Sequence, residues 1–90
     1  MSELKWLRNP AVLEAHRDEG WVLFNPDNGF FCGLDTVGSE VWGELEDRMS
    51  TAELVATFIR RFKVDAATCE RDVRAFLEKI AAKGFVTEQA

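Results

Sequence analysis

The sequence predicts an α+β domain in which a short antiparallel sheet is followed by three helices. Before residue 35, runs of β-forming residues are separated by a strong turn sequence at 25–29. After residue 35, apolar residues recur at helical spacing instead. A short antiparallel sheet cannot bury its apolar face alone, so we expect the helices to cover one side of it.

Length and composition fit one globular domain spanning 1–90. A chain of 90 residues can fold without disulfides or metals, and 47% hydrophobic with 30% charged residues excludes the disordered classes. Cys32 and Cys69 lack the spacing of a disulfide scaffold, so we expect two buried thiols in a reducing compartment.

Charge and hydropathy argue against two classes of partner. The formal net charge of −5 repels nucleic-acid backbones and anionic lipid surfaces. The longest apolar runs are far shorter than a membrane span, and the charged N-terminus lacks the apolar stretch of a signal peptide. We therefore expect a cytoplasmic protein with no nucleic-acid partner and no membrane partner.

Three strands are expected in the N-terminal third. Residues 12–16 alternate loosely, 20–24 are rich in β-formers, and 30–34 return as the second strand of a hairpin. In the turn between the last two strands, Pro26 presets one backbone angle and Asn28-Gly29 tolerates positive φ. No segment after Leu34 predicts a strand of comparable strength.

The first two helices are indicated by their caps and their apolar faces. Asp35 or Thr36 can cap a first helix, and Ser50 with Glu53 forms a capping box that begins a second. The apolar face of the first helix comprises Val37, Val41, Trp42 and Leu45. That of the second comprises Leu54, Val55, Phe58, Ile59 and Phe62.

A third helix follows Asp65, which can cap it. Gly84 suits a left-handed cap at its C-terminal end, with Phe85 folding back onto the helix. The second and third helices, joined by a tight break, resemble a helix-turn-helix, and together with the hairpin they predict a winged helix-turn-helix. The apolar arc of the third helix contains Cys69, Val73, Phe76, Leu77 and Ile80.

The sequence lacks the residue patterns that catalysis and metal binding need. His16 is the only histidine, and no cysteine or acidic cluster near it has zinc-ligand spacing. The glycines do not form a phosphate-binding loop. We expect no enzyme activity, no catalytic residues, no cofactor and no metal site.

The helix-turn-helix outline raises the alternative of a winged-helix DNA-binding protein. The third helix would then read the DNA, yet its acidic residues nearly cancel its basic ones. The basic residues are Arg71, Arg74, Lys79 and Lys83, and the acidic ones are Glu70, Asp72 and Glu78. The acidic balance of the whole chain also argues against this alternative.

The strand at 30–34 is apolar on both faces and carries no charge, proline or bulge that would guard an exposed edge. It is therefore either a central strand, flanked by the other two, or an edge strand meant to be paired. An edge could take an extended peptide by strand addition. It could also pair with, or swap into, a second copy of the chain to form a homodimer.

The third helix could supply the second wall of a peptide groove. Val73, Leu77 and Ile80 take the core side of its wheel, whereas Phe76 lies nearer the fringe. A groove with Cys69 and Phe76 at its floor would be rimmed by charged residues, and a role of Phe76 in the core alone stays open. The charged fringe residues are Asp72, Lys79 and Lys83.

Several motifs in order resemble the PqqD-like family over about 12–86. They are LDTVGSEVW at 34–42, STAEL at 50–54, FKVD at 62–65, DVRAFL at 72–77 and GFV at 84–86. The order and the spacing of these motifs, more than any single one, carry the resemblance. It implies a winged helix-turn-helix with three N-terminal strands and three helices.

The resemblance also implies a function. PqqD-like domains are recognition elements for ribosomally synthesised, post-translationally modified peptides (RiPPs), so the chain is expected to be a non-catalytic peptide chaperone. The precursor's leader peptide would add antiparallel to the third strand and lie in the cleft against the third helix. The expected leader-binding residues are Phe30, Phe31, Cys32, Gly33, Leu34, Cys69, Asp72, Val73, Phe76, Lys79, Ile80 and Lys83.

The same resemblance implies a second partner, the enzyme that modifies the precursor. A radical-SAM protein would match the branch of the family that makes the quinone cofactor pyrroloquinoline quinone. A leader protease or a cyclase would match the lasso-peptide branch.

Overall fold

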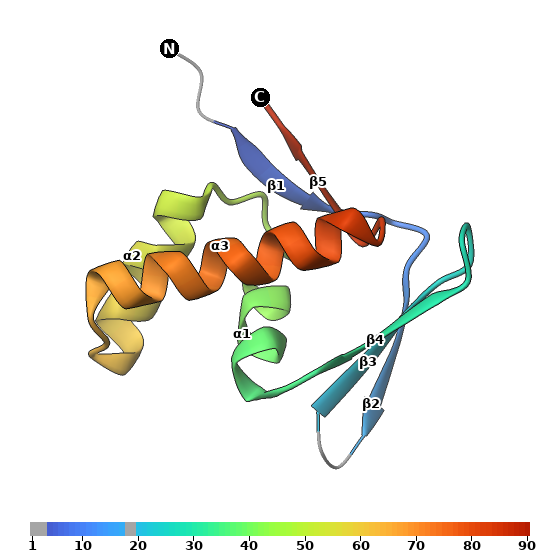
Figure 1. Cartoon of the computed structure of the whole chain (residues 1–90), viewed down its shortest axis with the longest axis horizontal. Helices are drawn as coiled ribbons and strands as arrows, with labels where there is room; N and C mark the ends of the chain where they lie inside the picture. The colour runs from blue at the N-terminus through green and yellow to red at the C-terminus, as the bar shows by residue number, and fades with distance from the viewer. Residues whose placement is uncertain (1–3, 18–19) are drawn as a thin grey trace.

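The computed structural model describes residues 4–17 and 20–90, which fold into three helices and two antiparallel sheets (Figure 1). One sheet has the order β2 (Leu13–Arg17), β3 (Gly20–Asn25), β4 (Phe30–Leu34). The other pairs β1 (Lys5–Arg8) with β5 (Val86–Gln89). The helices are α1 (Thr36–Glu44), α2 (Thr51–Phe62) and α3 (Ala66–Ala82). No helix in these ranges is long and apolar enough to cross a membrane.

The α+β class, the three helices and the three predicted strands, which are β2, β3 and β4, are confirmed, but the small sheet of β1 and β5 was not predicted. Each of these strands has four residues, and neither has more than two apolar ones. Long-range hydrogen bonds stabilise β1 instead. The Trp6 main-chain N–H donates to the Met49 carbonyl at 2.8 Å, and Trp6 Nε1 donates to Thr51 Oγ1 at 2.9 Å. β5 therefore follows Leu34 although its sequence predicted no strand of comparable strength.

The core lies between the helices and one face of the three-stranded sheet. Leu23 on β3 and Cys32 and Leu34 on β4 are buried on that face. They meet the buried residues Val41, Trp42, Leu54, Leu77 and Ile80 of the helices. In Figure 1 all three helices lie on the same side of the β2–β3–β4 sheet.

Polar caps fix where the helices begin, as the sequence predicts. Asp35 Oδ1 accepts the Gly38 N–H at 2.7 Å, and Ser50 with Glu53 forms the complete capping box. Asp65 accepts the Thr68 N–H at 3.0 Å. The Ser50 main-chain N–H, and then Lys5, lower the pKa of Glu53, and the Thr68 N–H lowers that of Asp65.

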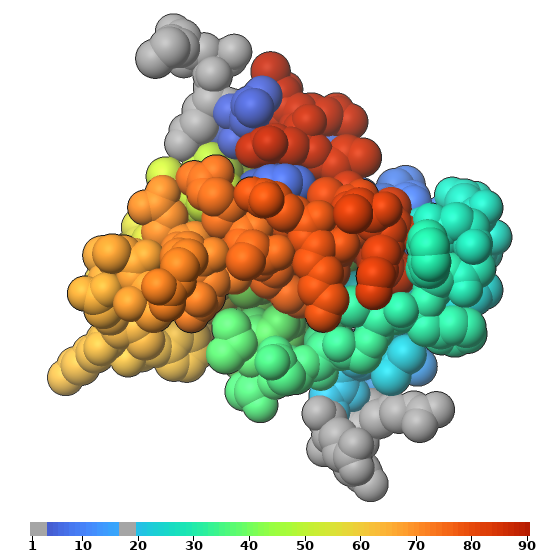
Figure 2. Space-filling view, in the orientation of Figure 1, coloured from blue at the N-terminus to red at the C-terminus, as the bar shows by residue number. Residues whose placement is uncertain are grey.

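The β3–β4 turn is tied to the C-terminal end of α3. Asn25, which is only 1% exposed, donates through Nδ2 to the carbonyls of Lys83 at 3.2 Å and Gly84 at 3.1 Å. Asn28 Nδ2 donates to the Lys83 carbonyl at 2.9 Å. Gly84 has the predicted left-handed conformation, with φ of 78°. Figure 2 shows the turn packed against this end of α3, so these asparagines fix β4 relative to α3.

Candidate functional site

β4 lies at the edge of its sheet. The strand order places β3 in the centre, and no other strand in the described ranges pairs with β4 (Figure 1). The alternative of a central strand at 30–34 is therefore wrong, and the edge interpretation is confirmed. The strand carries no charged side chain and no proline, so its free side has none of the usual guards against pairing.

Phe31 and Gly33 provide the main-chain groups of the free side. The carbonyl oxygen of Leu34 lies against Gly20 at the start of β3, so the main-chain groups of Leu34 face inward. These groups alternate along a strand, so those of Cys32 also face β3, and those of Phe31 and Gly33 face outward. A Cβ atom on Gly33 would meet no atom within 4 Å, so the sheet face over Gly33 is also open.

The side chains of β4 divide between the core and the surface. Cys32 and Leu34 are buried in the core, whereas Phe30 and Phe31 are 48% and 65% exposed. The Phe31 ring packs on the Phe24 ring of β3, with centroids 4.6 Å apart. Two large exposed apolar side chains on an open edge strand indicate that this edge binds a partner.

α3 presents some of its predicted residues to the core and some to the surface. Val73 and Ile80 are core residues, and Cys69 is 8% exposed. Phe76 is half-buried at the fringe, where its ring lies against the first turn of α1: a Cβ on Gly38 would be 3.1 Å from it. The side chains of Asp72 and Lys79 are exposed, and Lys83 is half-buried.

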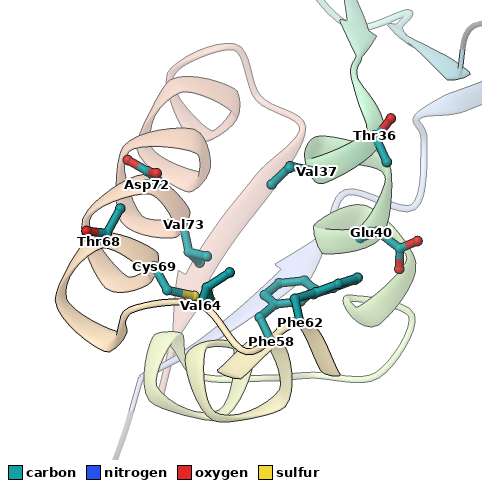
Figure 3. Close-up of a pocket in the computed structure, with 10 residues that line it drawn as sticks. All are labelled: Thr36, Val37, Glu40, Phe58, Phe62, Val64, Thr68, Cys69, Asp72 and Val73. Carbon is teal, nitrogen blue, oxygen red and sulfur yellow. The ribbon is translucent and has the colours of Figure 1, made fainter. Parts of the chain in front are cut away.

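A pocket of about 390 Å³ opens between the start of α1, the end of α2 and the start of α3 (Figure 3). Cys69, Asp72 and Val73 are the predicted site residues that line it. Phe76, the expected floor of the groove, does not line this pocket. The lining residues that the sequence did not indicate as site residues are Thr36, Val37, Glu40, Phe58, Phe62, Val64 and Thr68.

Three of these missed residues carry a signal that could have revealed them. Val37, Phe62 and Val64 are 62%, 48% and 42% exposed, although helical spacing assigned Val37 and Phe62 to core faces. Val37 and Phe62 stand at helix ends, and Val64 lies in the short segment between α2 and α3. An apolar residue at the very end of a helical pattern was the available signal.

The wall of the pocket follows β4 directly in the chain. β4 ends at Leu34, and Thr36 and Val37 of the pocket wall follow within three residues. Its interior is apolar, and charges lie only at its mouth: Glu40 pairs with Arg61 at 2.9 Å, and Asp72 is exposed. Burial, and then the charge of Asp72, raises the pKa of Cys69, so its thiol stays protonated at neutral pH.

Comparisons with known proteins show the family to which this chain belongs. The family model described as coenzyme PQQ synthesis protein D (PqqD) matches residues 20–86. One similar solved structure is TbiB1 in complex with the TbiA(beta) leader peptide, which is 38% identical, with a TM-score of 0.77, covering 89% of this chain and 93% of the other.

A second similar structure is lasso peptide synthetase B1 complexed with the leader peptide. It is 20% identical, with a TM-score of 0.78, covering 91% of this chain and 96% of the other. At this identity the likeness concerns the fold alone. The comparison with curated proteins found no match.

Proposed function

We propose that this chain, which belongs to the PqqD family of RiPP recognition elements, is a peptide chaperone that binds a precursor's leader and presents it to a modifying enzyme. The observation that carries the proposal is the unguarded edge of β4, which runs directly into an apolar pocket. An edge gives main-chain hydrogen bonds to any extended peptide, and a pocket beside it gives sequence preference. Catalysis is left to the partner enzyme.

The leader adds to β4 as an antiparallel strand. The outward main-chain groups of Phe31 and Gly33 form the hydrogen bonds of this new ladder, each contributing about 0.5–1.5 kcal/mol. Alternate leader side chains then point toward α3 and toward the opposite face of the sheet. Cys32 and Leu34 support the strand from the core.

The pocket holds an apolar side chain near the N-terminal end of the bound leader segment. In an antiparallel pair, that end of the leader lies beside Leu34, where β4 gives way to Thr36 and Val37 of the pocket wall. Burying one large apolar side chain here contributes roughly 1.5–3 kcal/mol. Ordering a flexible leader costs about 2–5 kcal/mol, so the ladder needs this anchor.

α3 forms the second wall of the cleft. Phe76 offers an apolar surface at the fringe of the helix, with Asp72, Lys79 and Lys83 available to polar leader residues. Val73 and Ile80 support this wall from the core, and Cys69 and Val73 also line the pocket. The clamp of Asn25 on the end of α3 holds the two walls at a fixed separation.

Binding the leader raises the local concentration of the attached precursor beside the modifying enzyme, which accelerates the reaction without chemistry in this domain. A radical-SAM protein, or a leader protease or cyclase, is the class of partner. The cytoplasm is the compartment, since it would keep the free thiols of Cys32 and Cys69 reduced. In this proposal α2 and α3 correspond to a helix-turn-helix and the β3–β4 hairpin to its wing.

Fluorescence polarisation with labelled TbiA(beta) leader tests the proposal. We expect saturable binding to the wild type, and none with a scrambled peptide. Val37→Asp places a charge at the apolar mouth and should weaken binding by about tenfold, or ~1.4 kcal/mol. Leu4→Asp is the matched control, because Leu4 is 50% exposed and lies outside the pocket.

Equal leader affinity of the wild type, Val37→Asp and Leu4→Asp would show that the pocket is not part of the leader-binding site. Absence of any saturable binding to the wild type would contradict the proposed function itself.

A further inference from the structure

The face of the β2–β3–β4 sheet that points away from the helices, here called the outer face, is apolar throughout its described side chains. The strand register aligns two rows across it. The first row is Leu13, Phe24 and Phe31, and the second is Ala15, Val22 and Gly33. Buried Leu23 and Cys32 lie on the opposite face, which fixes the orientation of both rows.

The outer face is open to solvent. Leu13 and Phe31 are 60% and 65% exposed, and the rings of Phe24 and Phe31 pack together across the strands. Figure 1 shows all three helices on the other side of the sheet. A solvent-facing sheet surface normally carries polar residues in alternation. A continuous apolar surface of this kind marks an interaction site.

The outer face is continuous with the edge that takes the leader in the proposed function. Phe31 and Gly33 belong to both, since their main-chain groups face the free edge and they occupy the ends of the two rows. A leader strand added to β4 would place its alternate side chains on the outer face, next to Phe31 and Gly33. The bound leader would therefore enlarge this apolar surface by one strand.

The size of the outer face argues against a second copy as its occupant. Three strands of about five residues span roughly 14 by 17 Å, or about 240 Å². A stable dimer buries roughly 800 Å² on each partner. An area this small suits a transient contact, which a domain that hands over its substrate requires. The net charge of −5 favours a partner with basic residues around its contact surface.

We propose that the outer face is the docking surface for the modifying enzyme, and that this enzyme recognises it together with the outward side chains of the bound leader. The partner surface is an apolar patch bordered by Lys and Arg. The inference rests on the proposed function, because the leader strand forms part of the surface. Leu13, two strands away from the free edge, belongs to the docking surface and not to the leader site.

The test uses Leu13→Asp, with Leu4→Asp as the matched control of similar exposure outside the β2–β3–β4 sheet. Leader binding of each protein is first measured with labelled TbiA(beta) leader. Each leader-loaded protein is then immobilised, and every enzyme encoded in this chain's own gene cluster, purified singly, is passed over it. Leu13→Ser replaces Leu13→Asp if urea unfolding shows that the latter does not fold.

We expect Leu13→Asp to bind leader within twofold of the wild type and to bind one enzyme at least tenfold more weakly, with Leu4→Asp unchanged. Omission of leader should also weaken that enzyme's binding. Equal enzyme binding by all three proteins, or none by the wild type, would overturn the docking surface. Self-association of the wild type that Leu13→Asp abolishes would assign the face to a second copy instead. Failure of the wild type to bind leader would instead overturn the proposed function.

Discussion

At the residue scale, Gly33 is the position where the main chain of β4 can be tested most cleanly. Its N–H faces the free side, and a side chain there would meet no atom of the protein within 4 Å. Gly33→Pro removes the N–H and should weaken leader binding by about 1–2 kcal/mol, whereas Gly33→Ala retains it and should bind within about threefold of the wild type. Calorimetric titration with the TbiA(beta) leader measures both.

Proline is tolerated on an edge strand whose N–H faces solvent, so Gly33→Pro should remain folded. If Gly33→Pro and Gly33→Ala bind the leader equally, this N–H does not belong to the ladder.

Helical periodicity predicts the direction of a side chain, but it does not predict whether a neighbouring element covers that side chain. Spacing placed Val73, Leu77 and Ile80 in the core correctly and set Phe76 at the fringe, because the direction of a side chain follows from its helical phase. Val37 and Phe62 have the right phase, but they lie where no neighbouring helix covers them. Helical phase does not record where a neighbouring helix ends, so periodicity alone could not predict the pocket.

At the element scale, the clamp between the β3–β4 turn and α3 predicts a difference between two asparagines. Asn25→Ala removes a buried donor from the carbonyls of Lys83 and Gly84, and should lower the free energy of unfolding by about 1–3 kcal/mol. Asn28→Ala is the control: Asn28 is exposed, and Asn25 still serves the Lys83 carbonyl, so a smaller loss is expected. Urea unfolding measures both.

Leader affinity should fall in Asn25→Ala as well, because the loosened α3 no longer holds the cleft at its bound width. Equal stability losses in Asn25→Ala and Asn28→Ala would contradict the clamp.

The caps of α2 and α3 predict how stability depends on pH. Main-chain N–H groups lower the pKa of Glu53 below 4.5 and that of Asp65 below 3.8, so both carboxylates stabilise the fold above those values. That stability should be lost as the pH falls from about 4.5 through the lowered pKa values. Asp65→Asn keeps a capping oxygen that does not titrate, so its free energy of unfolding should fall less steeply in urea titrations at acid pH.

An identical acid dependence in wild type and Asp65→Asn would show that the cap of α3 does not contribute.

A helix or strand could be predicted from the sequence when the residues that stabilise it lie close together in the chain. The caps at Asp35, Ser50 and Asp65 and the left-handed Gly84 are local signals, and the structure has all of them. The β1–β5 pair joins segments from the two ends of the chain, and Trp6 of β1 also pairs with Met49 in the middle of the chain. The four residues of each strand are too few to carry a sequence pattern that would predict such long-range contacts.

At the scale of the whole molecule, the fold divides its surfaces by role. The inner face of the β2–β3–β4 sheet builds the core, the edge of β4 and the pocket take the leader in the proposed function, and the outer face is left for the enzyme. No element moves in this account. A small acidic domain of this design orders a flexible peptide and displays it on a rigid sheet.

Strand addition to β4 is the central claim, and a two-dimensional amide NMR titration with the TbiA(beta) leader tests it most directly. The amide signals of Phe31 and Gly33 should shift downfield and gain protection from hydrogen exchange. Val37 and Cys69 at the pocket should shift too, while Glu88 in the distant β5 stays unchanged. Saturating leader that leaves Phe31 and Gly33 unshifted and unprotected would contradict the account.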